Sequence, residues 1–311
     1  MAKRWFKVKK TAVPVIIKKI KKNREIKALL YLLPALLIIT TFQIYPVFKS
    51  LAMSFYTDFD YLTGEVFKRG LDNFQYVLTD PDFYLALKNT FIFVLGAVPL
   101  SIVVSLGFAL LLNSNIKLKN FFRSVYFIPF ITSTVAVSIV WRWMFNKEFG
   151  IVNAVLMMLG INKINWLTNP KMTIPMLVLL SVWKGMGYKI IIFLAGLQNI
   201  DEKYYLAAKI DGASAWKRFT SITIPLLTPT LFFVSITSVI SSFKLFDEVY
   251  VLYDKQTGPL KSGLTIVYYI YNKFNRYWQF SIASAAAFVL FVIILIFTLI
   301  QLRIGQKKTN Y

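Results

Sequence analysis

Two lysines, Lys184 and Lys189, interrupt a long apolar stretch of the sequence. Ionisable side chains inside such stretches are costly to keep in lipid, so they usually face a bundle interior or an aqueous cavity. Aromatic rings and hydroxyl groups nearby can add stacking surfaces and hydrogen bonds for a polar solute. The residues that the sequence places as candidates for a solute path are Trp183, Lys184, Tyr188, Lys189, Ser238, Ser241, Ser242 and Lys244.

Structural roles for the same residues stay open. The two lysines can extend to the membrane surface or bond to a carbonyl group, and serines within spans commonly bond to their own or a neighbouring helix. Lys244 can pair with Glu248 one helical turn later. The aromatic rings can pack in the core or face lipid, because the chain holds 28 Phe and 17 Tyr.

The residue inventory excludes most enzyme chemistry. The chain has no Cys and no His, which removes thiolate and imidazole metal sites as well as Ser-His-Asp and Cys-His catalysis. We therefore expect no catalytic residues and no metal site. An integral membrane enzyme acting on lipid would need clustered carboxylates, whereas the acidic residues are scattered through loops. A membrane receptor or scaffold is the other alternative from a different class.

Composition identifies lipid as the main solvent of the chain. Hydrophobic residues make up 57% of the sequence and its mean hydropathy is +0.59. The net charge of +22 comes from basic residues at the ends of apolar runs, which favours a bilayer over nucleic acid. We predict an all-α membrane protein with six spans, within 28–48, 89–116, 121–145, 172–199, 225–246 and 278–302.

The distribution of positive charge sets the predicted orientation. The termini and the loops on their side carry roughly twice as many Lys and Arg as the alternate loops, so we expect both termini in the cytoplasm. The predicted parts are a basic N-terminal segment (1–27), a first span with its external loop (28–84), a five-helix core (85–303) and a cytoplasmic tail (304–311). No small-residue cleavage site follows the first apolar run, so that run should remain as a span.

Two segments outside the spans also have interpretable patterns. Residues 13–22 place apolar side chains at helical spacing among lysines, as in an interfacial helix, although a solvated tail fits equally well. The loops 57–82 and 150–160 are predicted to be ordered external caps, the second as a short apolar helix ended by Gly160.

The loop from Asp201 to Pro225 is unusually apolar for a connector. Asp201 can cap a short helix, Gly212 supplies a backbone that is free to turn, and Ser214 can cap a second helix ended by Pro225. Exposed apolar patches of this kind usually mark contacts with another protein, although a helix lying on the bilayer is the alternative. We interpret this loop as a bent two-helix element that contacts a partner.

The same loop resembles the "EAA" loop of ABC-importer permeases. AAKIDGA, then nine residues from Ala213 to Ser221, then Ile222 to Pro225, matches the family spacing of Glu-Ala-Ala, three residues, Gly, nine residues and Ile-x-Leu-Pro. FFRSVYFIPF, WRWMF, WKGMGY, FLAGLQNI and SSFKLFDEVYVL are similar to the carbohydrate-uptake branch. The resemblance extends from Tyr31 to Arg303 and covers the maltose, glycerol 3-phosphate and multiple-sugar permeases.

The resemblance implies a type I ABC importer permease fold in the cytoplasmic membrane. It implies alternating access for a carbohydrate, or for an anionic solute such as glycerol 3-phosphate or an acidic sugar. The implied partners are a second homologous permease, two ATPase subunits that bind ATP and Mg, and an extracellular solute-binding protein. The chain itself has no Gly-x-x-x-x-Gly-Lys-Ser/Thr phosphate loop. The implied ATPase-coupling residues are Leu206, Ala207, Ala208, Lys209, Asp211, Gly212, Ala213 and Pro225.

The sequence departs from the family pattern in two places. Leu206 stands where the family has glutamate, so contact with an ATPase must depend on shape and apolar packing more than on that charge. The turn after the fifth span reads DKQTGP, in which only Gly258 and Pro259 match the family's glycine-rich turn.

Overall fold

The computed structural model describes the backbone of residues 12–60, 63–114 and 119–309. Side chains are described for 25–60, 63–114, 121–122 and 124–305. The chain divides into two compact units, one ending at Met53 and one beginning at Ser54. The predicted interfacial pattern at 13–22 concerns side chains outside the described ones, although the backbone is helical from Ala12.

The first unit is a long apolar helix with one irregular turn. It consists of α1 (Ala12–Ile39), a π-helical turn (Thr40–Ile44) and α2 (Tyr45–Met53). Pro46 is the second residue of α2, in the first turn after the π turn. A proline ring collides with the carbonyl four residues earlier in a regular helix, and the wider turn relieves that collision. Residues 25–53 are long and apolar enough to cross a membrane.

Four further long helices of the second unit could each cross a membrane. They are α4 (Pro81–Asn113), α8 (Pro170–Gln198), α11 (Ile224–Phe243) and α14 (Phe280–Thr309). Asp80 and Asn169 cap α4 and α8 with their side chains, and proline occupies the first turn of both helices. The predicted helical membrane fold is confirmed, whereas the cytoplasmic termini and the four sequence parts stay predictions.

The third predicted span is a bent pair of helices and not one continuous helix. The chain forms α5 (Lys119–Ile131) and α6 (Thr134–Met144), which are bent by 105° at the break between them. The Thr132 hydroxyl donates to the carbonyl of Ile128, and Ser133 adopts a non-helical conformation with φ −52° and ψ 133°. Hydroxyl groups that compete for helical carbonyls favour such interruptions. Five long helices and one bent pair therefore account for the six predicted spans.

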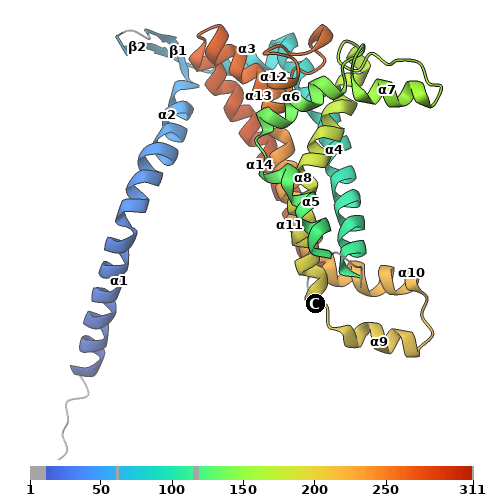
Figure 1. The fold of residues 1–311 in the computed structure, drawn as a ribbon. Helices are drawn as coiled ribbons and strands as arrows, with labels where there is room; N and C mark the ends of the chain where they lie inside the picture. Colours follow the sequence, from blue (N-terminus) through green and yellow to red (C-terminus); the bar gives the residue numbers. More distant parts are fainter. Residues whose placement is uncertain (1–11, 61–62, 115–118, 310–311) are drawn as a thin grey trace, which may run out of the picture. The chain divides into compact units, whose positions relative to one another are not determined.

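A group of short elements lies at the end of the second unit opposite α9 (Glu202–Ile210) and α10 (Ala215–Arg218) (Figure 1). They include the antiparallel pair β1 (Tyr56–Phe59) and β2 (Val66–Arg69), followed by α3 (Asp72–Thr79). The described residues of the two loops predicted to be ordered do form strands and helices, although the strand pair was not foreseen, and the external side of both loops stays a prediction. α7 (Ile151–Met158) ends before Gly160, whose φ is +75°. The remaining elements at this end are α12 (Asp247–Leu252), a 3-10 turn (Pro259–Lys261), α13 (Ile266–Tyr271) and a π turn (Asn272–Arg276).

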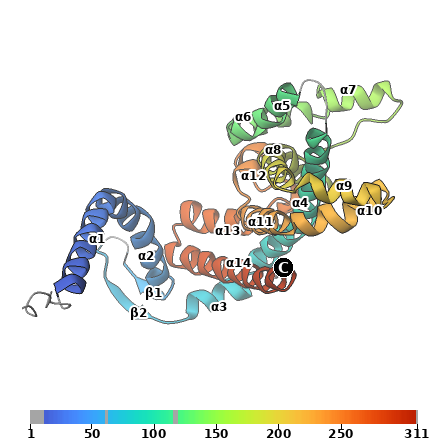
Figure 2. The ribbon, with the colours of Figure 1, turned by 90° about the horizontal axis from the view of Figure 1, so that it is seen from below.

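Helix α8 organises the packing of the second unit. It contacts α4, α5 and α11, and Figure 2 shows α8 lying among these helices. Gly187 permits the close approach of α5, because a Cβ at this position would collide with the carbonyl oxygen of Tyr126. One face of α8 is thereby buried, which leaves the face toward α11 to line a cleft.

Candidate functional site

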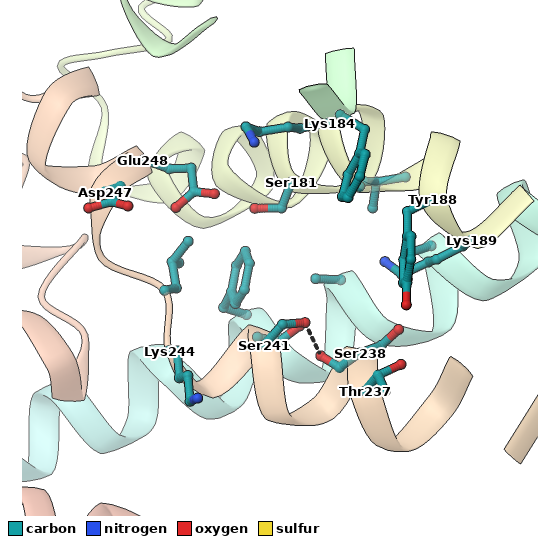
Figure 3. A pocket seen from close by; sticks show the side chains of 18 residues that line it. Ser181, Lys184, Tyr188, Lys189, Thr237, Ser238, Ser241, Lys244, Asp247 and Glu248 are labelled. Carbon is teal, nitrogen blue, oxygen red and sulfur yellow. Dashed lines mark hydrogen bonds between the residues drawn. The ribbon is translucent and has the colours of Figure 1, made fainter. Parts of the chain in front are cut away.

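A cleft of roughly 490 Å³ lies along α8 and α11. Figure 3 shows polar side chains projecting into it from both helices and from the start of α12. Its polar lining consists of Ser101, Ser181, Lys184, Tyr188, Lys189, Thr237, Ser238, Ser241, Ser242, Lys244, Asp247 and Glu248. The cleft is therefore large enough for a small polar solute and rich in groups that can bond to one.

Helical spacing explains why these side chains share the cleft. On α8, Ser181, Lys184 and Tyr188 recur at intervals of three and four residues. On α11, Ser238 and Ser241 do the same. Residues at this spacing lie on one face of a helix. Each helix thus presents one polar stripe to the other.

The structure brings together most of the residues predicted from the sequence. Seven of the eight solute-path candidates line the cleft, and Trp183 alone is absent from its lining. The ring of Trp183 packs against Trp141 of α6, with 5.7 Å between ring centroids. Trp183 is next to Lys184 in the sequence, but its side chain lies on a different face of α8 from the polar stripe. Packing against another helix therefore determines where its ring lies.

Two carboxylates in the cleft were missed by the sequence reasoning. Asp247 and Glu248 open α12 after the chain turns at Phe246. Figure 3 shows both at the end of the cleft toward which Lys184 extends. Burial raises the pKa of Glu248, and the charge of Asp247 adds to the rise, while Lys184 opposes it. In the sequence, only their position directly after a long apolar run marks these carboxylates as candidates. The packing of α12 back against α8 cannot be predicted from the neighbouring residues.

Lys244 does not pair with Glu248, contrary to one alternative. No ion pair joins the two among the described residues. The pairing required a continuous helix, whereas α11 ends at Phe243 and α12 begins at Asp247. Lys244 instead lies on the α11 side of the cleft, opposite α8.

Some hydroxyl groups of the cleft have spare bonding capacity. Ser241 donates to the backbone carbonyl of Ser238 at 3.1 Å. The buried hydroxyls of Ser181 and Ser238 have no hydrogen-bond partner within the described part of the chain. Buried polar atoms usually find a partner, so these groups favour a polar occupant or water in the cleft.

The loop between α8 and α11 begins with a capped helix. The Asp201 carboxylate accepts a hydrogen bond from the backbone N–H of Lys203 at 2.9 Å, as predicted for the cap of α9. Tyr205 on α9 bonds through its hydroxyl to that of Thr223 at 2.9 Å. This contact holds α9 against the base of α11.

A residue in the left-handed backbone conformation then reverses the direction of the chain. Gly212 has a φ of +75°, and Ala213 and Gly212 donate to the carbonyls of Ala208 and Lys209 at 2.8 and 3.1 Å. These two bonds form a Schellman motif, which strongly favours glycine at the left-handed position. The predicted bend at Gly212 is confirmed.

The second helix of the loop is capped as predicted but does not end at Pro225. The Ser214 hydroxyl accepts from the N–H of Lys217 at 3.2 Å, and α10 continues through a π turn (Phe219–Thr223) into α11. Pro225 lies half-buried in the first turn of α11. As at Pro46, the π turn accommodates the proline ring, so the expected helix end was wrong.

The loop presents apolar side chains to its surroundings. Ile210 and Trp216 are 87% and 72% exposed, and Leu206 and Tyr204 are also exposed. Ile210 was missed as a candidate, although it lies next to the predicted Asp211. Loop residues Ala207, Lys209, Asp211 and Gly212 are exposed, whereas Ala208 and Ala213 are half-buried within the turn.

The described residues hold no group of three or more His, Cys, Asp and Glu side chains arranged to bind a metal ion. The chemistry available to the cleft therefore consists of hydrogen bonding, charge and stacking, which suits reversible solute binding.

Comparisons with known proteins assign the family. The model of the family described as "Binding-protein-dependent transport system inner membrane component" matches residues 97–310. The lactose transport system permease protein LacF of Rhizobium radiobacter is 36% identical over 294 residues, covering 93% of this chain and 97% of that protein. The arabinooligosaccharides transport system permease protein AraP of Bacillus subtilis is 38% identical over 278 residues, covering 89% and 87%.

A solved structure supports the fold. A chain from a bacterial ABC transporter involved in the import of the acidic polysaccharide alginate aligns with a TM-score of 0.81 at 24% identity, covering 95% of this chain and 99% of that one. The shared fold, the apolar spans and the matched family model agree. The chain is therefore a multi-pass cell membrane protein of the binding-protein-dependent transport system inner membrane component family, a permease subunit of an ABC importer and not an enzyme.

Proposed function

We propose that this permease moves a carbohydrate through the cleft between α8 and α11 by alternating access, driven by ATP hydrolysis on a separate chain. The observation that carries the proposal is the cleft itself, a polar cavity lined by seven of the eight solute-path candidates. Its hydroxyl groups can bond to sugar hydroxyls, and the ring of Tyr188 offers a flat apolar surface for a sugar face. Relatives named for lactose and arabinooligosaccharide transport support this substrate class.

The loop from Asp201 to Pro225 is the proposed coupling element. Its exposed apolar side chains at Ile210 and Trp216 can enter a groove on an ATPase, since buried aromatic and apolar anchors supply most of the energy of such contacts. The rigid turn at Gly212 and the unbroken path from α10 into α11 would transmit movement of the ATPase to one wall of the cleft. ATP and Mg would be bound by that ATPase, because the sequence has no phosphate loop of its own.

The remaining assembly follows from the same proposal. The end bearing α9 and α10 would face the cytoplasm, and the end bearing α7 and α12 would face the external solute-binding protein. A second homologous permease, most simply a different chain, would complete the path, and two ATPase subunits would serve the pair. The core that performs transport would be residues 85–303.

Copurification of the ATPase tests the coupling element. Ile210→Asp should reduce the amount of ATPase recovered with the permease about tenfold or more, because it places a charge at an apolar contact. Ile161→Asp is the matched control, since Ile161 is also exposed but lies beyond α7 at the opposite end of the unit. Equal recovery of ATPase with both variants would refute the assignment of the loop.

Uptake tests the transport role. Proteoliposomes that contain the permease pair and its ATPase should accumulate saccharide only with ATP and the external binding protein present. Hydrolysis that proceeds without saccharide accumulation, for every saccharide that the binding protein retains, would contradict the proposed function.

A further inference from the structure

The ammonium group of Lys189 lies over Gly185, in the wall of the cleft. A Cβ at Gly185 would be 3.4 Å from Nζ of Lys189, so the glycine leaves room for the lysine side chain to fold back along α8. This direction is the usual one for long side chains on a helix, which point toward the N-terminus. The side chain is partly buried and lines the cleft together with Tyr188.

Lys189 has no acidic partner within the described part of the chain. It takes part in none of the ion pairs or side-chain hydrogen bonds found there. The two carboxylates of the cleft, Asp247 and Glu248, lie at the other end, where Lys184 extends toward them (Figure 3). Positive charge is thus balanced at the end near α12 and unbalanced at the end near Tyr188.

An unpaired ammonium in such a place carries a substantial energetic cost. Removing an ion from water costs several kcal/mol even after the protein relaxes, as an order-of-magnitude figure. Ionisable residues within membrane spans are accordingly functional in most cases and pair with a counter-charge or line an aqueous path. A solute that brings its own negative charge would offset this cost.

A flat surface for a sugar ring adjoins the ammonium. Tyr188 stacks on Phe130 of α5, with ring centroids 5.2 Å apart and planes inclined by 18°. Both residues line the cleft, and the stacked pair holds the Tyr188 ring in a fixed orientation. A saccharide placed on this ring would have its substituents within reach of Lys189 on α8 and of Thr237 and Ser238 on α11.

We infer that the solute is an acidic saccharide whose anionic group pairs with Lys189 while its ring packs on Tyr188. The anionic group is a carboxylate, as in a hexuronate, or another oxyanion such as a sulfonate. The inference rests on the proposed function of the cleft and narrows its substrate class. Lysine suits this role because its compact ammonium binds one oxyanion without requiring the planar geometry of a guanidinium.

Melting temperature of the assembled importer in nanodiscs tests the inference, with glucuronate and glucose as probes at equal concentration and ionic strength. Glucuronate should raise the melting temperature of the wild type more than glucose does, since a ligand stabilises the state that binds it. Lys189→Gln should bind glucuronate about tenfold more weakly, as expected for the loss of one charged hydrogen bond. Lys189→Arg should keep the preference for glucuronate over glucose. If it does, the weaker binding of glucuronate by Lys189→Gln results from the lost charge and not from misfolding.

The matched control is Lys88→Gln, which removes one positive charge from an exposed site on α4 outside the cleft. It should bind glucuronate as the wild type does. The melting temperature with glucose 6-sulfate, compared with that with glucose, distinguishes a site that binds oxyanions in general from one restricted to carboxylates.

Three results would overturn the inference. They are equal stabilisation of the wild type by glucuronate and glucose, no stabilisation by glucuronate, or an unchanged preference in Lys189→Gln. The first is also the result expected if a carboxylate of the second permease occupies Lys189. Stabilisation by glucose alone refutes the acidic solute but leaves carbohydrate transport intact, whereas failure of both probes together with failed uptake contradicts the proposed function as well.

Discussion

The ammonium of Lys273 lies 3.0 Å from Oδ2 of Asp80, joining the π turn after α13 to the start of α4. Their side chains are only 11% and 12% exposed. Lys273 also donates to the hydroxyl of Tyr76 at 2.9 Å, and Tyr269 donates to Asp80 at 2.7 Å. The pair therefore has the additional hydrogen bonds that a buried ion pair needs.

Removing one partner of this ion pair should destabilise the end of the permease that carries α12 and α13. Lys273→Met leaves the Asp80 carboxylate buried with only Tyr269 and a backbone N–H as donors. We expect a loss of about 2–4 kcal/mol, since an uncompensated buried charge is costly. Thermal denaturation in detergent measures it. Lys68→Met is the control, because the Lys68–Asp72 pair is 66% and 55% exposed and should contribute less than about 1 kcal/mol. A similar loss in both variants would contradict the prediction.

The same pair predicts a dependence of stability on acid. Burial opposes ionisation of Asp80, but hydrogen bonds from Tyr269 and Lys273 outweigh it and lower the pKa of the carboxyl below 3.8. A lowered carboxyl pKa contributes stability above the unfolded value, and this contribution disappears as pH falls through the folded value. The difference in melting temperature between wild type and Asp80→Asn should therefore be constant at neutral pH and shrink below about pH 4. A difference that grew in acid would refute the assignment.

The contribution of Lys273 to stability should be lost at high pH, in contrast to that of Asp80. Burial opposes its charge, yet bonds to Tyr76 and Asp80 raise the pKa of its ammonium above 10.5. A raised lysine pKa contributes stability below the unfolded value, and this is lost as pH rises through the folded value. The destabilisation of Lys273→Met should accordingly persist up to about pH 10 and diminish only at higher pH. Melting curves in alkaline buffers check this, and a loss already complete at pH 8 would exclude it.

Gly187→Ala should weaken the contact between α5 and α8. The added Cβ would meet the backbone of Tyr126, which cannot move as a flexible side chain can. Overpacking of this kind costs about 1–3 kcal/mol. Gly107→Ala is the matched control, because nothing lies within 4 Å of a Cβ there and alanine favours a helix. The melting temperature distinguishes the two variants. Equal melting temperatures would show that α5 shifts away from α8 at no cost in stability.

Gly212→Ala should loosen coupling without loss of the spans. Nothing lies within 4 Å of a Cβ at Gly212, so the cost comes from its φ of +75° alone, about 1 kcal/mol for an L-residue. We expect solute-stimulated ATPase activity to fall severalfold, while Gly212→Asn, which tolerates this conformation better, falls less. Equal activity of Gly212→Ala and wild type would remove the turn from the coupling mechanism.

The sequence by itself determined the features that depend on local spacing. Lys184 and Tyr188 lie on one face of α8 because helical geometry requires it, and Ser238 and Ser241 follow the same rule on α11. The bend of the loop from Asp201 to Pro225 was predictable because Gly212 is the residue that adopts a left-handed conformation at little cost. Family membership also followed from spacing, through the residues from Ala207 to Pro225.

Only the tertiary structure decided the features that depend on contacts between distant elements. Trp183 turns toward Trp141 although it lies next to Lys184, and the acidic start of α12 returns to α8 across a turn with no strong local signal. The 105° bend between α5 and α6 likewise exceeds what Thr132 and Ser133 indicate in a chain that is otherwise apolar there. Hydrogen bonds between residues a few positions apart determine which side chains share one face of a helix. The balance of charge around Lys189, in contrast, depends on which helices pack together.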